Sequence, residues 1–180
     1  LVRVHAASVN ALDYRRFQKS SALGRFMDER LVPVIGTVLG ADIAGTVEAV
    51  GPGVERTDVG DQVFGVAADL RGGFAEFARA RERELAPKPA GVPFAQAAAV
   101  PSAAVTALQC LRRCGRLDAG RKVLIHGASG GVGTFAVQLA LASGAEVTAV
   151  CSASGAETAR ALGAHHAIDY TREDFVACPR

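Results

Sequence analysis

Three glycines spaced three residues apart form the part of the sequence best suited to chemistry. Gly127, Gly130 and Gly133 follow an apolar run at 122–126 and precede a stretch, 131–142, with apolar residues at helical spacing. Between a strand and a helix, glycine lets the chain turn sharply, lets the backbone approach a pyrophosphate without a Cβ, and lets the helix pack closely on the sheet. The first N–H groups of the helix add the positive end of its dipole. The pattern predicts a dinucleotide-binding loop, and the alternative is a tight turn that binds nothing.

The residues after the second expected strand bear on which dinucleotide would bind. A site that prefers NAD usually has Asp or Glu there, about 20 residues past the glycines, to hold the ribose 2′-OH. This strand ends in Cys151 and Ser152, without an acid, so nothing at that place repels a 2′-phosphate and Ser152 can donate a hydrogen bond to it. NADPH is therefore favoured over NADH, with Arg160 and Arg172 as the candidate cations. Ser152 is equally typical of an ordinary residue at the start of a loop.

Strands and helices must alternate to position these residues, and the second half of the chain shows that alternation. Apolar runs at 122–126 and 146–150 predict buried strands, a third strand begins at Ala167, and 131–142 and 156–162 predict helices. This β-α-β-α-β order is the first half of a doubly wound parallel sheet of the Rossmann type. Before it lies an alanine-rich helical stretch, 94–111, which Pro101 must break or kink.

The first half of the chain has short strands separated by glycine-rich turns. Strands are expected at 1–4, 45–51, 60–65 and 73–78, with one helix at 11–18. Several short strands at close spacing predict a small barrel or sandwich. Prolines at 87, 89 and 93 mark the change of pattern, so the chain is predicted to be an α/β protein with domains at 1–93 and 94–180.

The overall composition excludes several classes of function. The 180 residues include 20 Lys and Arg against 18 Asp and Glu, a formal net charge of +2, and 49% are hydrophobic. The hydrophobic content argues against a disordered chain, and the near-neutral charge argues against an electrostatic nucleic-acid binder. No apolar run approaches the roughly 20 residues of a membrane span.

The cysteines and histidines do not form a recognisable metal site. Four cysteines are widely spread, and the four histidines offer no matching ligand pattern. His126, His165 and His166 are interpreted as structural. The thiols are typical of a reducing compartment, so a cytoplasmic location is expected. A targeting segment would not be seen if it preceded Leu1, with which the chain begins in place of Met.

Several longer motifs match one known family over residues 2–175. They are ASVNALDY at 7–14, LGADIAGTV at 39–47, VGDQVFG at 59–65, the stretch 101–107, the glycine loop, and residues 162–170. Together these motifs are highly specific. The chain resembles a zinc-independent quinone oxidoreductase (zeta-crystallin-like) of the medium-chain dehydrogenase/reductase superfamily.

The resemblance implies a fold, a reaction and a set of site residues. It implies a GroES-like β-barrel domain followed by a Rossmann domain, with the active site between them, and hydride transfer from NADPH to a quinone or to the alkene of an enone. It also implies a homodimer of the parent protein. The implied substrate-pocket residues are Asn10 and Tyr14, and the implied cofactor-binding residues are Thr106, Ser129, Gly130, Gly131, Val132, Gly133, Ser152 and Tyr170.

The sequence departs from the family pattern in ways that bear on metal and cofactor. Zinc-dependent relatives have a catalytic Cys near Asn10 and a Gly-His-Glu where this chain has Gly40-Ala41-Asp42. Without these ligands a zinc mechanism is excluded, and hydride attack on a quinone or enone needs no strong general acid. Ser154 occupies a family position that is often basic, which weakens the case for NADPH.

Alternative interpretations remain for the pocket residues and for the function. Asn10 is a favoured N-cap, Tyr14 is suited to packing, and Asp13 is interpreted as structural. A dinucleotide-binding protein without turnover, or an enoyl-reductase module of a larger synthase, would share these motifs. The chain is expected to be a piece that lacks the opening strands of the barrel and the C-terminal half of the Rossmann sheet. Expressed alone, it is expected to be poorly soluble and inactive.

Overall fold

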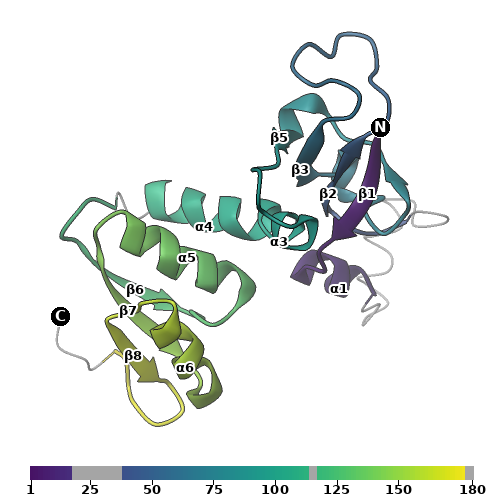
Figure 1. Cartoon of the computed structure of the whole chain (residues 1–180). Coiled ribbons are helices and arrows are strands. Elements are labelled where there is room, and N and C mark those ends of the chain that lie inside the picture. Colours follow the sequence, from purple (N-terminus) through teal and green to yellow (C-terminus); the bar gives the residue numbers. More distant parts are fainter. Residues whose placement is uncertain (18–37, 114–116, 177–180) are drawn as a thin grey trace. The chain divides into compact units, whose positions relative to one another are not determined.

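The computed structural model describes residues 1–17, 38–113 and 117–176 (Figure 1). The chain forms two compact units, Leu1–Ser102 and Ala103–Arg180. The domain boundary between residues 93 and 94 stays a prediction. No helix in the described part of the chain combines the length and the apolar character needed to cross a membrane.

The first unit is built on an antiparallel sheet of five strands. The strand order is β4-β1-β2-β3-β5, and the apolar side chains of the first three strands in the chain meet in one core. Helix α1 follows β1, and α3 packs on the sheet through alanines that contact Ala44. The elements are β1 (Val2–Ala7), α1 (Ala11–Phe17), β2 (Asp42–Val47), β3 (Gln62–Val66), the 3-10 turn η1 (Ala68–Leu70), β4 (Phe77–Ala78), the 3-10 turn η2 (Glu82–Glu84), β5 (Leu85–Pro87) and α3 (Phe94–Ala98).

Two of the expected strands in this unit differ from the structure. The strand expected at 73–78 is reduced to β4, because the N–H groups of Gly73 and Phe74 bond to the carbonyls of Gly40 and Leu39 in a turn. The strand expected at 45–51 ends at Val47 and begins earlier, at the start of β2. The helix expected at 11–18 is α1, and residue 18 lies outside the described residues.

Pro101 separates two helices, as the sequence predicts. Helix α3 ends at Ala98, and α4 (Pro101–Arg113) begins at the proline itself. Proline is favoured as the first residue of a helix, because its missing N–H has no partner there in any case.

The second unit alternates strands and helices around a parallel sheet in the order β6-β7-β8. Helices α5 and α6 contact the sheet mainly through small apolar residues such as Ala136, Ala140 and Ala159, which share one core with Val147 and Ala149. The structure therefore confirms the predicted α/β fold class and the β-α-β-α-β order. The elements are β6 (Lys122–His126), α5 (Gly131–Ala142), β7 (Glu146–Cys151), α6 (Ala153–Ala161) and β8 (His166–Asp169).

Candidate functional site

The glycine loop joins the end of β6 to the start of α5 (Figure 1). Gly127 has a φ of +73°, a left-handed conformation that glycine adopts without strain. The N–H groups of Gly127 and Ala128 both donate to the carbonyl of Val150 in β7, at 2.9 and 3.2 Å, and Gly130 N–H donates to Gly127 O at 2.9 Å. These bonds hold the turn against the neighbouring strand.

Close packing explains two of the glycines around this loop. A Cβ on Gly133 would collide with Gly127 O and lie 2.7 Å from Ala128 Cα, so only glycine lets α5 approach the turn this closely. A Cβ on Gly155, in the first turn of α6, would collide with Ser129 Oγ and lie 2.6 Å from Ser129 Cβ. Gly155 is missing from the predicted site residues, although a glycine in the first turn of the helix after the second strand is a visible signal.

The glycine loop also has open space at the end where α5 begins. A Cβ on Gly131 would meet no atom within 4 Å. Gly130 occupies the N-cap position of α5 and has no side chain with which to bond the first N–H groups of the helix. Exposed N–H groups, a positive helix end and free space suit a pyrophosphate, so this loop fits a dinucleotide.

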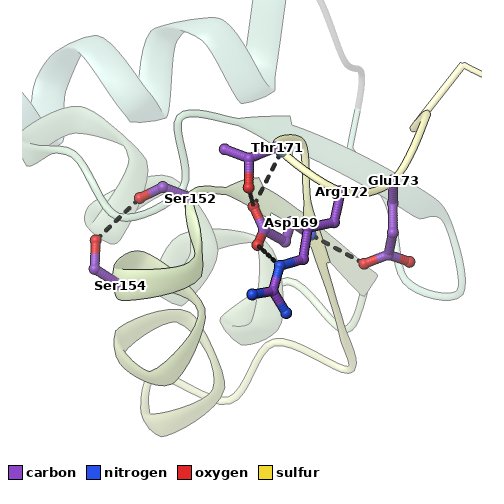
Figure 2. A network of polar contacts seen from close by, with 6 residues as sticks. All are labelled: Ser152, Ser154, Asp169, Thr171, Arg172 and Glu173. Atoms are coloured by element: carbon purple, nitrogen blue, oxygen red, sulfur yellow. Dashed lines mark hydrogen bonds and ion pairs between the residues drawn. The ribbon is translucent and has the colours of Figure 1, made fainter.

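Ser152 lies beside this loop, at the N-cap position of α6, where β7 has just ended. Its Oγ lies 3.1 Å from Ser154 Oγ, and no cap bond from the Ser152 side chain to the helix is formed (Figure 2). Two hydroxyl groups therefore lie at the N-terminus of α6, where the sequence predicts the 2′-phosphate to bind.

The sheet brings an acid to the end of β7, and this acid is missing from the predicted site residues. Parallel pairing puts Asp169, the last residue of β8, opposite Cys151. Its Oδ1 accepts from the hydroxyl (2.7 Å) and the backbone N–H (3.0 Å) of Thr171, and its Oδ2 lies 3.9 Å from Arg172 Nε (Figure 2). The Thr171 hydroxyl, then its N–H group, and less strongly Arg172, hold the pKa of Asp169 below its usual value. Asp169 is thus engaged within its own turn.

Arg172 and Tyr170 also lie near the ends of these strands. The Arg172 side chain is 82% exposed, and Tyr170 is half-exposed. The Tyr170 N–H donates to Cys151 O, and its ring lies 6.1 Å from the ring of His126 at the end of β6. A hollow of about 370 Å³ is lined by residues 170–175. Cys151 itself is buried, and this burial raises the pKa of its thiol.

The pocket residues expected from the sequence lie in the first unit, after β1. Asp13 is fully buried, and its carboxylate accepts from the N–H groups of Asn10 (2.9 Å) and Gly40 (3.2 Å). The carbonyl of Asn10 accepts from the N–H groups of Asp13 and Tyr14, which begins α1, and the Tyr14 side chain is 57% exposed. Asp13 therefore has the structural role expected of it. It fixes the loop that carries Asn10.

A second buried carboxylate in this unit is also missing from the predicted site residues. Asp42, at the start of β2, has no exposed surface. Its Oδ2 accepts from Asn10 Nδ2 (3.2 Å), Ser8 Oγ (3.4 Å) and Ser102 N–H (2.9 Å), while its Oδ1 accepts from Ser102 Oγ (2.5 Å). An acid inside an otherwise apolar strand is the sequence signal that could have identified it.

The structure thus places the candidate residues in two groups. Asn10 and Tyr14 lie together in the first unit, and the loop 129–133 lies near Ser152 and Tyr170 in the second. Thr106 is an exposed residue of α4, in the second unit. Among the described residues, no group of three or more His, Cys, Asp and Glu side chains could hold a metal ion.

Two family models match the chain. The alcohol dehydrogenase GroES-like domain matches residues 1–90, and the zinc-binding dehydrogenase domain matches residues 131–178.

Curated relatives cover almost the whole chain. The chloroplast envelope quinone oxidoreductase homolog of Arabidopsis thaliana is 40% identical over 182 residues, which are 98% of this chain and 54% of the relative. The 2-methylene-furan-3-one reductase of Solanum lycopersicum is 35% identical over 188 residues, 99% of this chain and 46% of the relative. The spectinabilin polyketide synthase system protein NorB of Streptomyces orinoci is 45% identical over 162 residues, 90% of this chain and 7% of that protein. The chain spans about half the length of the first two.

Solved structures of related proteins also match almost the whole chain. The quinone oxidoreductase of Coxiella burnetii matches with a TM-score of 0.86 and 34% identity, and the match covers 99% of this chain and 56% of the relative. The Escherichia coli quinone oxidoreductase complexed with NADPH matches with a TM-score of 0.81 and 30% identity, and the match covers 97% of this chain and 51% of the relative. With matching family models at both ends and relatives of this similarity, the chain belongs to the medium-chain dehydrogenase/reductase superfamily.

Proposed function

We propose that the protein is an NADPH-dependent oxidoreductase that transfers a hydride to a quinone or to the alkene of an enone, without zinc. The geometry of the glycine loop is the observation that carries this proposal. Gly133 lets α5 pack against the turn, and the space at Gly131 is open beside the first N–H groups of the helix. NADPH, when bound, supplies the hydride from its nicotinamide ring.

The residues of the second unit would bind and orient the dinucleotide. The N–H groups at the start of α5 would accept the pyrophosphate, with Ser129 and Val132 beside it. Ser152 would donate to the 2′-phosphate, with Tyr170 next to the adenosine and the exposed Arg172 supplying positive charge. The structure of the Escherichia coli relative contains NADPH, which supports NADPH as the cofactor.

The substrate class is proposed from the relatives and from the residues of the first unit. One relative is named for a quinone and another for a furanone with an exocyclic alkene. Asn10 and Tyr14 would line the substrate pocket, and Thr106 would lie at the nicotinamide end of the site. The hydride adds to an electron-poor carbon, and the resulting oxyanion takes a proton from water, so the carbonyl needs no Lewis acid.

Zinc independence is proposed from the chemistry of the side chains at the positions where zinc-dependent relatives bind the metal. Asn10 and Ala41 offer no thiolate or imidazole there, and Asp42 has its oxygens occupied by hydrogen-bond donors. We also propose that the complete protein is a homodimer.

A second candidate is an enoyl-reductase module of a larger synthase. The similarity to NorB, of which this chain covers 7%, favours it. Such a module would reduce the alkene of a thioester-bound chain by the same hydride chemistry. The two candidates differ in the group attached to the alkene and in the proteins that flank this sequence.

The test is NADPH consumption by the complete protein with a panel of quinones, enones and enoyl thioesters, followed as loss of nicotinamide absorbance. Saturable turnover of a quinone or a free enone, unchanged by a zinc chelator, is the expected result. Turnover of enoyl thioesters alone would favour the synthase module. Saturable NADPH binding without consumption of any substrate would leave a dinucleotide-binding protein that is not an enzyme.

A further inference from the structure

Asp42 is a fully buried carboxylate that accepts hydrogen bonds from several donors. No ion pair in the described part of the chain includes it. A buried charge is costly unless its oxygens are satisfied, and this carboxylate accepts four hydrogen bonds, close to the capacity of its two oxygens. The donors come from two segments: the loop after β1, which holds Ser8 and Asn10, and the start of α4, which holds Ser102. Asp42 therefore ties these segments to β2.

The bond to Asn10 settles which way its side-chain amide points. A carboxylate oxygen that accepts a hydrogen bond must face Nδ2 and not Oδ1, because Oδ1 cannot donate. The same Nδ2 also donates to Ser8 Oγ, at 3.1 Å. An amide nitrogen carries two hydrogens, and these two acceptors use both of them. Asn10 has no donor left for a ligand, and its carbonyl oxygen is the only group of the amide that a ligand can bind.

The bonds to Ser102 explain why Asp42 keeps its own position. Ser102 is the second residue of α4, and a helix needs an acceptor for the N–H groups of its first turn. Val100, just before the proline, has no side-chain acceptor, so the distant Asp42 takes the place of an N-cap residue. The carboxylate is thus anchored to the start of α4 through both of its oxygens, and its Oδ2 also accepts from Asn10 Nδ2.

We propose that Asp42 is a positioning residue, which locks the Asn10 amide with its N–H₂ group turned into the protein and its carbonyl oxygen available to a ligand. Asn10 then recognises a hydrogen-bond donor. Such donors are the carboxamide N–H₂ of a nicotinamide or the O–H of a reduced quinone. Asn10 does not polarise the carbonyl of a quinone or enone. This inference rests on the proposed function, which places Asn10 in the pocket.

The decisive experiment is a double-mutant cycle in the complete protein with Asp42→Ala and Asn10→Ala. Asp42→Ala removes both oxygens and so the acceptor of the Asn10 amide, and we expect kcat/KM to fall about tenfold or more, while the Kd of NADPH changes by less than about twofold. In the Asn10→Ala background the same change should alter kcat/KM by less than about twofold, because the amide that it orients is gone. Equal losses in the two backgrounds would overturn the proposal, since a role confined to capping α4 does not depend on Asn10.

Ser102→Ala is the matched control for the helix side of the network. It removes the hydroxyl that bonds to Oδ1 but leaves the Asn10 bond to Oδ2 in place. We expect it to lower the melting temperature, as Asp42→Ala does, with a much smaller change in kcat/KM. Equal effects of the two variants on kcat/KM would attribute both to stability and would contradict the proposal.

Solvent exchange of the Asn10 side-chain amide protons, measured by NMR, does not depend on turnover. We expect these protons to exchange about tenfold faster in Asp42→Ala than in the wild type. Unchanged exchange would overturn the proposal even in an active enzyme, whereas faster exchange in a protein that reduces no substrate would refute only the proposed function. If Asp42→Ala does not fold, Asn10→Asp serves as a second variant. It must destabilise the protein more than Asn10→Ala, because two carboxylates would then meet.

The source of the donor is identified with two ligand analogues. If Asn10 accepts from the carboxamide, Asn10→Ala should erase the preference for NADPH over its 3-acetylpyridine analogue, which lacks the N–H₂ group. If it accepts from a reduced quinone, Asn10→Ala should erase the preference for hydroquinone over its dimethyl ether as a product inhibitor. Retention of both preferences would contradict the assigned role of Asn10.

Discussion

Replacing Gly133 by alanine tests whether the glycine loop is as tightly packed as the structure shows. The added Cβ would collide with Gly127 O and lie 2.7 and 2.8 Å from the Cα and C atoms of Ala128. These are backbone atoms of a turn that is bonded to Val150 O, so no side-chain rotation can relieve the contact. Overpacking of this kind costs about 1–3 kcal/mol, which the better helix propensity of alanine offsets by up to about 1 kcal/mol.

The expected result is a loss of both stability and cofactor binding. A net cost of about 1–2 kcal/mol lowers the melting temperature by roughly 2–8 °C in a protein of this size class. To relieve the contact, α5 must move away from the turn, which displaces its first N–H groups from the pyrophosphate. We expect the Kd of NADPH to rise about tenfold or more. Thermal unfolding by circular dichroism and titration calorimetry measure the two effects.

Gly131→Ala is the matched control, two residues away on the same helix. Its Cβ would meet no protein atom within 4 Å, so the fold should be as stable as the wild type or slightly more so. The methyl group would instead occupy the space that we assign to the pyrophosphate, and NADPH should bind much more weakly. Wild-type affinity in this variant would show that the open space is not the cofactor site. An unchanged melting temperature in Gly133→Ala would show that the turn is not closely packed.

Four further outcomes follow from the strand ends of the second unit. Ser152→Asp should weaken NADPH more than NADH, measured as the ratio of their Kd values; an unchanged ratio would remove Ser152 from the 2′-phosphate site. Asp169→Asn should tighten NADPH binding and leave NADH unchanged, because it releases Arg172; weaker NADH binding would show that Asp169 holds the ribose. The lowered pKa of Asp169 means that its ionised form stabilises the protein above about pH 4 and that this contribution is lost as the pH falls through the lowered pKa. The melting temperatures of wild type and Asp169→Asn should therefore converge in acid, and a constant difference would contradict this. Gly155→Ala should lower the melting temperature and weaken NADPH, because its Cβ would displace Ser129, whereas a neutral result would exclude that contact.

The elements of the second unit could be predicted almost residue by residue, because each depends on a local pattern. The apolar run at β6, the helical spacing in α5 and the glycines between them lie within about 20 consecutive residues, and the structure confirms their bounds. The break at Pro101 depends on one residue and is confirmed as well. Helix α6 begins three residues earlier than predicted, since Gly155 lowers the helix propensity of a turn that packing on Ser129 stabilises.

The roles of the two acids could not be predicted, because each depends on partners that only the fold brings together. Asp42 bonds to Ser102, which is 60 residues away, and to Asn10, which is 32 residues away. Asp169 reaches the end of β7 only through the register that pairs it with Cys151. The sequence motif places the cofactor-binding acid at the end of the second strand. It gives no reason to consider an acid at the end of the third.

Asp169 also bears on the proposed preference for NADPH. Its carboxylate would repel a 2′-phosphate if it were free, but Thr171 donates two hydrogen bonds to Oδ1, and Arg172 lies 3.9 Å from Oδ2. Arg172 is 82% exposed and lies at the long end of the ion-pair range from Asp169, so Arg172 can leave Asp169 at little cost. A phosphate monoester carries more charge than a carboxylate and attracts the guanidinium more strongly. The proposed preference for NADPH would therefore depend on the exchange of Arg172 between Asp169 and the phosphate as well as on the serine hydroxyls at the start of α6.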